Sequence, residues 1–162
     1  GGAKNLLSEQ ALRRWPIEYY VELANKLLEN NYDVYISGAK SDEWICKYFS
    51  SDVNNLVGTT TLEETLSIIN DSDIVVTHDS GPLHLSLLIV KKKIISIFGP
   101  VLDIARIPQN LDKKLSIVLS DYNRLPSCSP CYDGSSFASC DNNLCMQEHK
   151  PEEVLHLIQK HS

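Results

Sequence analysis

The residues best suited to chemistry in this sequence lie in one short stretch, Asp79-Ser80-Gly81-Pro82-Leu83-His84. This stretch follows the apolar run Ile74-Val75-Val76-Thr77, which predicts a buried strand. Glycine lets a backbone approach a ligand closely, and proline suits the first turn of a helix. Side chains of a first helical turn lean back toward the amino end, so we expect His84 to point toward Asp79 and Ser80. An acceptor, a hydroxyl, free amides and an imidazole would then surround one spot, suited to a sugar diphosphate.

The same stretch also has a purely structural interpretation. Asp or Ser before a helix is most often an N-cap, and a lone histidine in a first turn is usually structural. The motif alone leaves both interpretations open.

Strand-like and helix-like segments alternate around this motif. Helical spacing of apolar residues begins at Pro16, and Thr61 with Glu64 forms a capping box that starts another helix. The sequence also predicts helices over 41–50, over 82–90 and from Pro151, and strands over 33–37, 74–77, 94–98 and 115–119. Such alternation indicates crossover connections and therefore an α/β fold with a parallel sheet flanked by helices.

In sheets of this kind, ligands bind beyond the carboxyl ends of the strands. Those ends are predicted at Ser37-Gly38, at His78-Asp79-Ser80-Gly81 and at Phe98-Gly99-Pro100. All three contain turn residues, which places the motif at the expected binding edge.

Composition and charge limit the classes of function. The chain has 162 residues, 43% of them hydrophobic, which is enough for a single domain over 1–162 with its own core. The net charge of −6 argues against nucleic acid as a partner, but an anionic small ligand can still be held by backbone amides and one or two arginines. No apolar run approaches the roughly 20 residues that span a bilayer, and no secretory signal is recognisable. Because the chain opens on the loop-like Gly1-Gly2-Ala3, we expect it to be part of a longer protein.

Six motifs in chain order resemble those of glycosyltransferase family 9, the bacterial heptosyltransferases. They are Gly1-Gly2-Ala3, Arg13-Arg14-Trp15-Pro16, Ser37-Gly38, Thr61-Leu62-Glu63-Glu64, Asp79-Ser80-Gly81-Pro82-Leu83-His84 and Phe98-Gly99-Pro100. The resemblance covers nearly the whole chain and is to the C-terminal half of the family. It implies one Rossmann-like domain of a GT-B enzyme, in which two such domains face each other across a cleft.

The resemblance also implies what each half does. The C-terminal half would bind the nucleotide-sugar donor, typically ADP-heptose, for inverting transfer to the lipopolysaccharide inner core. The N-terminal half would bind the lipid-linked saccharide acceptor and supply the general base, so no residue of this chain is expected to be that base. It implies a cytoplasmic enzyme, peripheral at the inner membrane, without a catalytic cofactor. We expect the isolated domain to be inactive.

The family's donor-binding residues transfer to eleven positions of this sequence. Gly2 and Ala3 would lie at the pyrophosphate, Arg13 or Arg14 at the phosphate, and Glu43 at the nucleoside. The remaining positions, near the adenosine and at the sugar and phosphates, are Thr60, Thr61, Asp79, Ser80, Gly81 and His84. Plainer interpretations stay open for some of them: a solvated arginine pair, a surface glutamate, and a helix cap at Thr61.

The five cysteines divide into one isolated residue and a cluster. Cys46 is interpreted as a small core residue in a helix. The other four, Cys128, Cys131, Cys140 and Cys145, lie in a Cys-rich loop over 125–146, with the paired spacing of a structural zinc site. Two disulfides or free thiols are the alternatives, and a cytoplasmic location disfavours disulfides. In every case we expect a structural role.

Two further functional classes remain compatible with the residues. One is a non-catalytic nucleotide- or phosphosugar-binding module that keeps the glycine-containing loops. The other is a zinc-stabilised interaction domain, in which the α/β core is only a scaffold.

Overall fold

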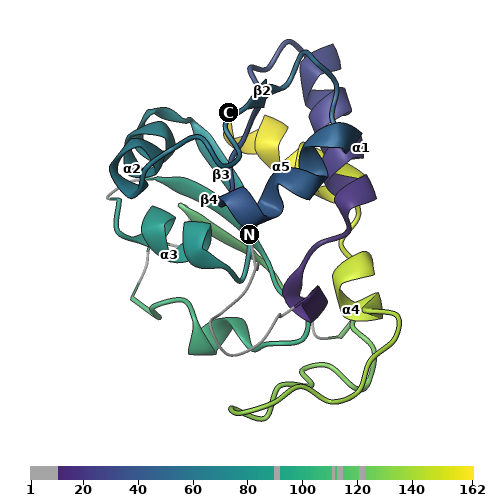
Figure 1. The fold of residues 1–162 in the computed structure, drawn as a ribbon. Coiled ribbons are helices and arrows are strands. Elements are labelled where there is room, and N and C mark those ends of the chain that lie inside the picture. The colour runs from purple at the N-terminus through teal and green to yellow at the C-terminus, as the bar shows by residue number, and fades with distance from the viewer. Residues whose placement is uncertain (1–10, 90–91, 111, 113–114, 121–122) are drawn as a thin grey trace.

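The computed structural model describes residues 11–89, 92–110, 112, 115–120 and 123–162 (Figure 1). Helices and strands alternate through most of the described chain. In chain order the elements are η1 (Ala11–Arg13), α1 (Ile17–Glu29), β1 (Tyr35–Ile36), η2 (Lys40–Tyr48), β2 (Asn54–Asn55), α2 (Leu62–Asp71), β3 (Ile74–His78), α3 (Gly81–Leu87), β4 (Lys93–Ile97), η3 (Asp103–Ala105), β5 (Ser116–Leu119), α4 (Leu144–Gln147) and α5 (Pro151–His161). The η elements are 3-10 helices. The predicted α/β class is confirmed.

The strands form parallel sheets, as the alternation predicts. β3, β4 and β5 pair side by side in that order, with Ile74 opposite Lys93 and Ile94 opposite Ser116. β1 and β2 form a separate two-stranded parallel sheet. The sequence predicts only one sheet and no strand at β2, because β2 consists of two exposed asparagines, a residue type with low strand propensity.

The three-stranded sheet is covered on both faces. Along β4, Ile95 and Ile97 face a core cluster with Trp15 and the α5 residues Val154 and Ile158. Ile94 and the following Phe98 face a second cluster with Leu83 of α3. Figure 1 shows α2 and α3 on one side of this sheet and α1 and α5 on the other. Burial on both faces explains why these three strands are mostly apolar.

The predicted helix starts are confirmed where a capping signal is present. α1 begins directly after Pro16, and at α2 the Thr61 hydroxyl accepts from the Glu64 backbone N–H while the Glu64 carboxylate accepts from the Thr61 N–H. Residues 40–48 are helical, as expected, but form a 3-10 helix, and the strand predicted over 33–37 shortens to β1. Within the described residues, no helix is both long and apolar enough to cross a membrane.

Two hydrogen bonds fasten the segment before α5, one to Trp15 before α1 and one to the carboxyl end of β4. The Trp15 indole N–H donates to the His149 carbonyl oxygen at 2.8 Å. The His149 ring Nε2 lies 3.0 Å from the Phe98 carbonyl oxygen. Because a carbonyl can only accept, Nε2 carries the hydrogen. His149 itself is completely buried, and it links Trp15 through its backbone carbonyl and the end of β4 through its ring, just before α5 begins.

This buried histidine predicts a pH dependence of stability. Burial lowers the pKa of His149 below its ordinary value, although the hydrogen bond to Phe98 opposes that shift. The unfolded chain therefore takes up a proton before the folded chain does. The histidine's contribution is fully present above the unfolded pKa of about 6.5 and is lost as the pH falls below it, by at most about 1.4 kcal/mol per pH unit.

Denaturant unfolding between pH 7.5 and 5 measures this contribution. We expect the free energy of unfolding of the wild type to fall more steeply than that of His149→Gln. The matched control is His156→Gln, which alters an exposed histidine on α5 and should keep the wild-type slope. Equal slopes for the wild type and His149→Gln would contradict the prediction.

Candidate donor-binding site

Asp79 is the central residue of the candidate site. It directly follows β3, and only 2% of its surface is exposed. The Arg13 guanidinium Nη1 lies 3.1 Å from Asp79 Oδ2, and Arg106 Nε lies 3.4 Å from the same oxygen. His84 Nε2 is 3.9 Å from the other oxygen, Oδ1. The predicted convergence of His84 and Asp79 is therefore present, and two arginines join it.

The charges of this group favour an anion in front of it. One buried carboxylate faces two guanidiniums, so the local charge is positive although the chain as a whole is acidic. Oδ1 of Asp79 is buried and accepts no hydrogen bond from the described residues. The site therefore offers cationic donors together with one remaining acceptor.

Arg13 and Arg14, which the sequence leaves as alternatives, have different environments. Arg13 belongs to η1 and reaches Asp79. The guanidinium carbon of Arg14 instead lies 5.9 Å from the centre of the Trp44 ring, which is a cation–π distance. The structure therefore brings Arg13, and not Arg14, into the Asp79 group.

Arg106 belongs to the site but is absent from the sequence-based predictions. It lies just after η3, in the loop that follows the turn Phe98-Gly99-Pro100, and its guanidinium carbon is 5.7 Å from the Tyr132 ring centre. No motif or periodicity marks it. The available signal was positional, because a basic residue in the loop after a strand's carboxyl end lies near the expected binding edge.

Ser80 has a different environment from the one expected. It is 95% buried, and its hydroxyl donates to the His78 carbonyl oxygen at 3.2 Å and lies 3.3 Å from the Thr77 hydroxyl. It makes no side-chain capping bond to α3. Its hydroxyl thus stabilises the turn after β3, while Gly81 is exposed, and a Cβ there would contact nothing within 4 Å.

His78, at the end of β3, is held from behind by Tyr20 of α1. The Tyr20 hydroxyl lies 2.9 Å from His78 Nδ1. Burial raises the pKa of Tyr20, so its hydroxyl stays protonated and can donate to the ring nitrogen. This contact fixes the strand end from which Asp79 projects.

The residues expected near a nucleoside lie together but apart from Asp79. A Cβ at Gly58, which has φ +73°, would lie 3.0 Å from the Glu43 carboxylate, so Glu43 reaches the loop that leads to Thr60. The Thr60 hydroxyl bonds to the Thr65 hydroxyl at 3.0 Å, and Thr61 caps α2. No hydrogen bond or ion pair among the described residues joins Glu43, Thr60 or Thr61 to Asp79 and its partners. Gly2 and Ala3 lie outside the described residues.

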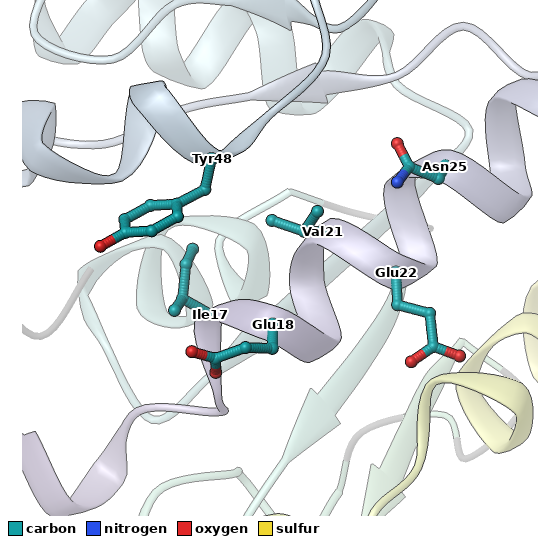
Figure 2. A pocket seen from close by; sticks show the side chains of 6 residues that line it. All are labelled: Ile17, Glu18, Val21, Glu22, Asn25 and Tyr48. Carbon is teal, nitrogen blue, oxygen red and sulfur yellow. The ribbon is translucent and has the colours of Figure 1, made fainter.

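Two hollows differ in how they relate to these residues. A narrow crevice at the ends of β3 and β4 is lined by Arg13, Asp79, Ile97, Phe98, Gly99, Pro100, Val101 and Met146. A larger, open hollow of about 330 Å³ lies between α1 and η2, where Tyr48 faces Ile17 and Val21 (Figure 2). The larger hollow contains none of the expected site residues, whereas the crevice, which encloses almost no free volume, includes Arg13 and Asp79.

All five cysteines are free thiols. Burial, and after it the charges on Cys131, Cys140 and Cys128, raises the pKa of Cys145 to about 11. Burial and the same neighbours also raise the pKa of Cys131. The four loop cysteines are therefore close enough to interact electrostatically. Over the part of the chain that the structure describes, no three His, Cys, Asp or Glu side chains already stand as metal ligands.

Comparisons with known proteins agree on one family. The family model described as "Glycosyltransferase family 9 (heptosyltransferase)" matches residues 5–133. Lipooligosaccharide heptosyltransferase 2 of Campylobacter jejuni is 29% identical over 91% of this chain and 46% of its own length. The chain thus spans about half the length of the curated relatives that it matches over most of its own length.

Two solved structures share the fold. The structure of Escherichia coli ADP-heptose lps heptosyltransferase II matches with a TM-score of 0.66 at 21% identity, over 92% of this chain and 42% of that one. A glycosyltransferase family 9 structure from Veillonella parvula matches with a TM-score of 0.72 at 18% identity, over 94% and 43%. At these identities the likeness concerns the fold.

Proposed function

Because the chain belongs to glycosyltransferase family 9, we propose that it binds the nucleotide-sugar donor of a heptosyltransferase. The observation that carries this proposal is the group of Arg13, Arg106 and His84 around the buried Asp79, at the carboxyl edge of a parallel sheet. The donor is ADP-heptose or a similar sugar nucleotide, in keeping with the names of the relatives.

The chemistry of glycosyl transfer assigns a role to the two arginines. When the bond between sugar and diphosphate breaks, negative charge grows on the leaving nucleoside diphosphate. Cations already fixed at that position stabilise the transition state more than the ground state. Arg13 and Arg106 are such cations, because Asp79 holds both guanidiniums before a ligand arrives.

Asp79 has two tasks in this proposal. Its Oδ2 orients the arginines, and its unoccupied acceptor Oδ1 binds a hydroxyl of the sugar. We assign the anion to the arginines and His84 rather than to the amino end of α3, because that helix has only seven residues. Glu43 and Thr60, next to the Gly58 turn, are proposed for the nucleoside.

The remaining steps are proposed to depend on residues outside this chain. The relatives are about twice as long as the chain, so a second half has room to bind a lipid-linked saccharide acceptor of the lipopolysaccharide inner core and to supply the general base. Such an enzyme would work in the cytoplasm, at the inner membrane where its acceptor lies. No catalytic cofactor is part of the proposed reaction.

Calorimetric titration of the purified protein with ADP, an ADP-sugar and a UDP-sugar tests the proposal. We expect saturable binding of ADP and of the ADP-sugar at one site per chain. Arg124→Ala is the control, because Arg124 forms an exposed ion pair with Glu153. A folded sample that binds none of the three at millimolar concentration would contradict the proposal.

Replacement of His84 tests the exposed edge of the site. The His84 side chain is 54% exposed, so His84→Ala should leave the free energy of unfolding nearly unchanged. It should weaken ADP-sugar binding about tenfold, because one hydrogen bond to a charged group contributes about 1.5–3 kcal/mol.

His156→Ala on α5 provides the matched control for this variant, since it removes another exposed imidazole. It should bind the ADP-sugar as the wild type does. If His84→Ala kept full affinity, His84 would have to be removed from the site.

A further inference from the structure

Few interactions fix the backbone conformation of the segment from Leu125 to Asn143. It contains neither a helix nor a strand of a sheet, and one isolated bridge joins Tyr132 to Phe137. Leu125 is its single buried residue. Ordering each residue costs about 1–2 kcal/mol of backbone entropy, which so little apolar burial does not offset. Another kind of interaction must fix this segment.

Backbone contacts bring the cysteines of this segment to the turn after β4. The Cys131 N–H donates to the Pro100 carbonyl oxygen at 3.0 Å. The Cys145 sulfur lies 2.8 Å from the position that a Cβ at Gly99 would occupy, so only glycine allows its approach. The backbone of Cys131 and the sulfur of Cys145, 14 positions apart in the chain, therefore both lie beside one turn.

Asn143 brings the next cysteine to the same place. Its backbone N–H donates to the Cys140 sulfur at 3.3 Å, and its side-chain oxygen accepts from the Cys145 thiol at 3.7 Å. It adopts the left-handed conformation, with φ 48° and ψ 39°, at the start of α4. Backbone N–H donation to sulfur is the outer-shell contact that stabilises a metal-bound thiolate.

We propose that the sulfurs of Cys128, Cys131, Cys140 and Cys145 together bind one thiophilic divalent cation, with Zn²⁺ as the natural occupant. Their C-x2-C and C-x4-C spacing suits tetrahedral thiolate coordination at about 2.3 Å. Cys128 is exposed, Cys131 and Cys140 are half-buried, and Cys145 is buried. Metal binding would require the first three side chains to turn toward Cys145, because the described residues contain no preformed group of metal ligands. A dication also removes the mutual repulsion of four thiolates, which are otherwise too costly to form together.

The proposed metal site would also hold Arg106 in position beside Asp79, because it fixes the neighbouring Tyr132. The N–H groups of Cys131 and Tyr132 both donate to the Pro100 carbonyl oxygen, at 3.0 and 3.1 Å. The Tyr132 ring then lies under the guanidinium of Arg106, which contacts Asp79. Fixing Cys131 therefore fixes the aromatic surface on which Arg106 rests, and Arg106 is a positioned cation rather than a freely moving one.

Metal content is the primary test. The purified protein, stripped of metal under reducing conditions and reloaded with zinc sulfate alone, should retain about one zinc per chain after desalting. Cys128→Ser and Cys140→Ser should retain much less. Cys46→Ser is the matched control, because Cys46 is a cysteine outside the loop and bonds weakly to Asn55. Cys128 is exposed, so its variant tests ligation without threatening the core.

Two further measurements use the wild-type chain, so they remain valid even if a cysteine variant fails to fold. Zinc should protect four of the five thiols from a thiol reagent and leave Cys46 reactive. Cobalt(II) in place of zinc should give the sulfur-to-metal charge-transfer absorption and intense visible bands of tetrahedral thiolate coordination. Substoichiometric zinc in the wild type, equal zinc in Cys128→Ser and Cys140→Ser, or two disulfides in the purified protein would overturn the proposal.

These readouts are independent of the proposed function. Zinc content and thiol protection can fail while ADP binding succeeds, and the reverse also holds. The supporting role toward Arg106 has its own readout, since zinc removal should weaken ADP binding in the wild type but not in Arg106→Ala. Equal weakening in both would show that the metal does not act through Arg106.

Discussion

Replacement of Asp79 by asparagine is expected to lower the free energy of unfolding by about 2 kcal/mol. Removing one partner of a fully buried ion pair costs about 3–5 kcal/mol, because the other charge stays buried without compensation. Here the carboxylate side chain is 3% exposed, but Arg13 and Arg106 are 18% and 31% exposed, so water partly compensates them. Asparagine keeps the shape of the side chain, so the loss reports its charge.

Denaturant unfolding with a matched control measures this effect. Asp73→Asn alters an exposed aspartate just before the start of β3 and should change stability by less than about 0.5 kcal/mol. A double-mutant cycle with Arg13→Ala should return a coupling energy of about 1 kcal/mol or more. Asp79→Asn with wild-type stability would show that the carboxylate does not hold the arginines.

The second large effect concerns the affinity for ADP, which should depend on Arg13 much more than on the adjacent Arg14. Arg13→Ala should weaken ADP binding about tenfold to a hundredfold, since one or two hydrogen bonds to a charged group are lost. Arg14→Ala should have a much smaller effect, because Arg14 lies against Trp44. Arg106→Ala should resemble Arg13→Ala, because both guanidiniums contact the same oxygen of Asp79.

Calorimetry on the three variants, at one fixed salt concentration, gives the comparison directly. Arg124→Ala serves as the control for removing a guanidinium that pairs with Glu153 rather than with Asp79. If Arg14→Ala weakened ADP binding more than Arg13→Ala, the assignment of the phosphate contact would have to be exchanged. If neither Arg13→Ala nor Arg14→Ala weakened ADP binding, the diphosphate would have to bind elsewhere.

Local signals were sufficient for most of the fold. Pro16 starts α1, the Thr61–Glu64 capping box starts α2, and the apolar runs become β3 and β4. These features depend on residues within a few positions of one another, which a sequence displays. β2 carries no such signal, because its two asparagines are exposed and their pairing with β1 is a tertiary contact.

The location of the candidate site was predictable from the sequence, but the hydrogen bonds and ion pairs within it were not. Parallel strands end at one edge, so the convergence of Asp79 and His84 followed from the strand and turn pattern. The distinction between Arg13 and Arg14 depends on the direction of η1 relative to β3, which spacing does not encode. Arg106 lies in a loop and contacts Asp79, and the Ser80 hydroxyl lies beside that of Thr77. No periodic pattern in the sequence marks either position.

The bond from Trp15 to the His149 carbonyl spans 134 positions of the chain. Only one residue separates Trp15 from Arg13, so His149, far along the chain, helps to position Arg13. A change that displaces the backbone at position 149 is therefore expected to weaken ligand binding without any contact between that residue and the ligand.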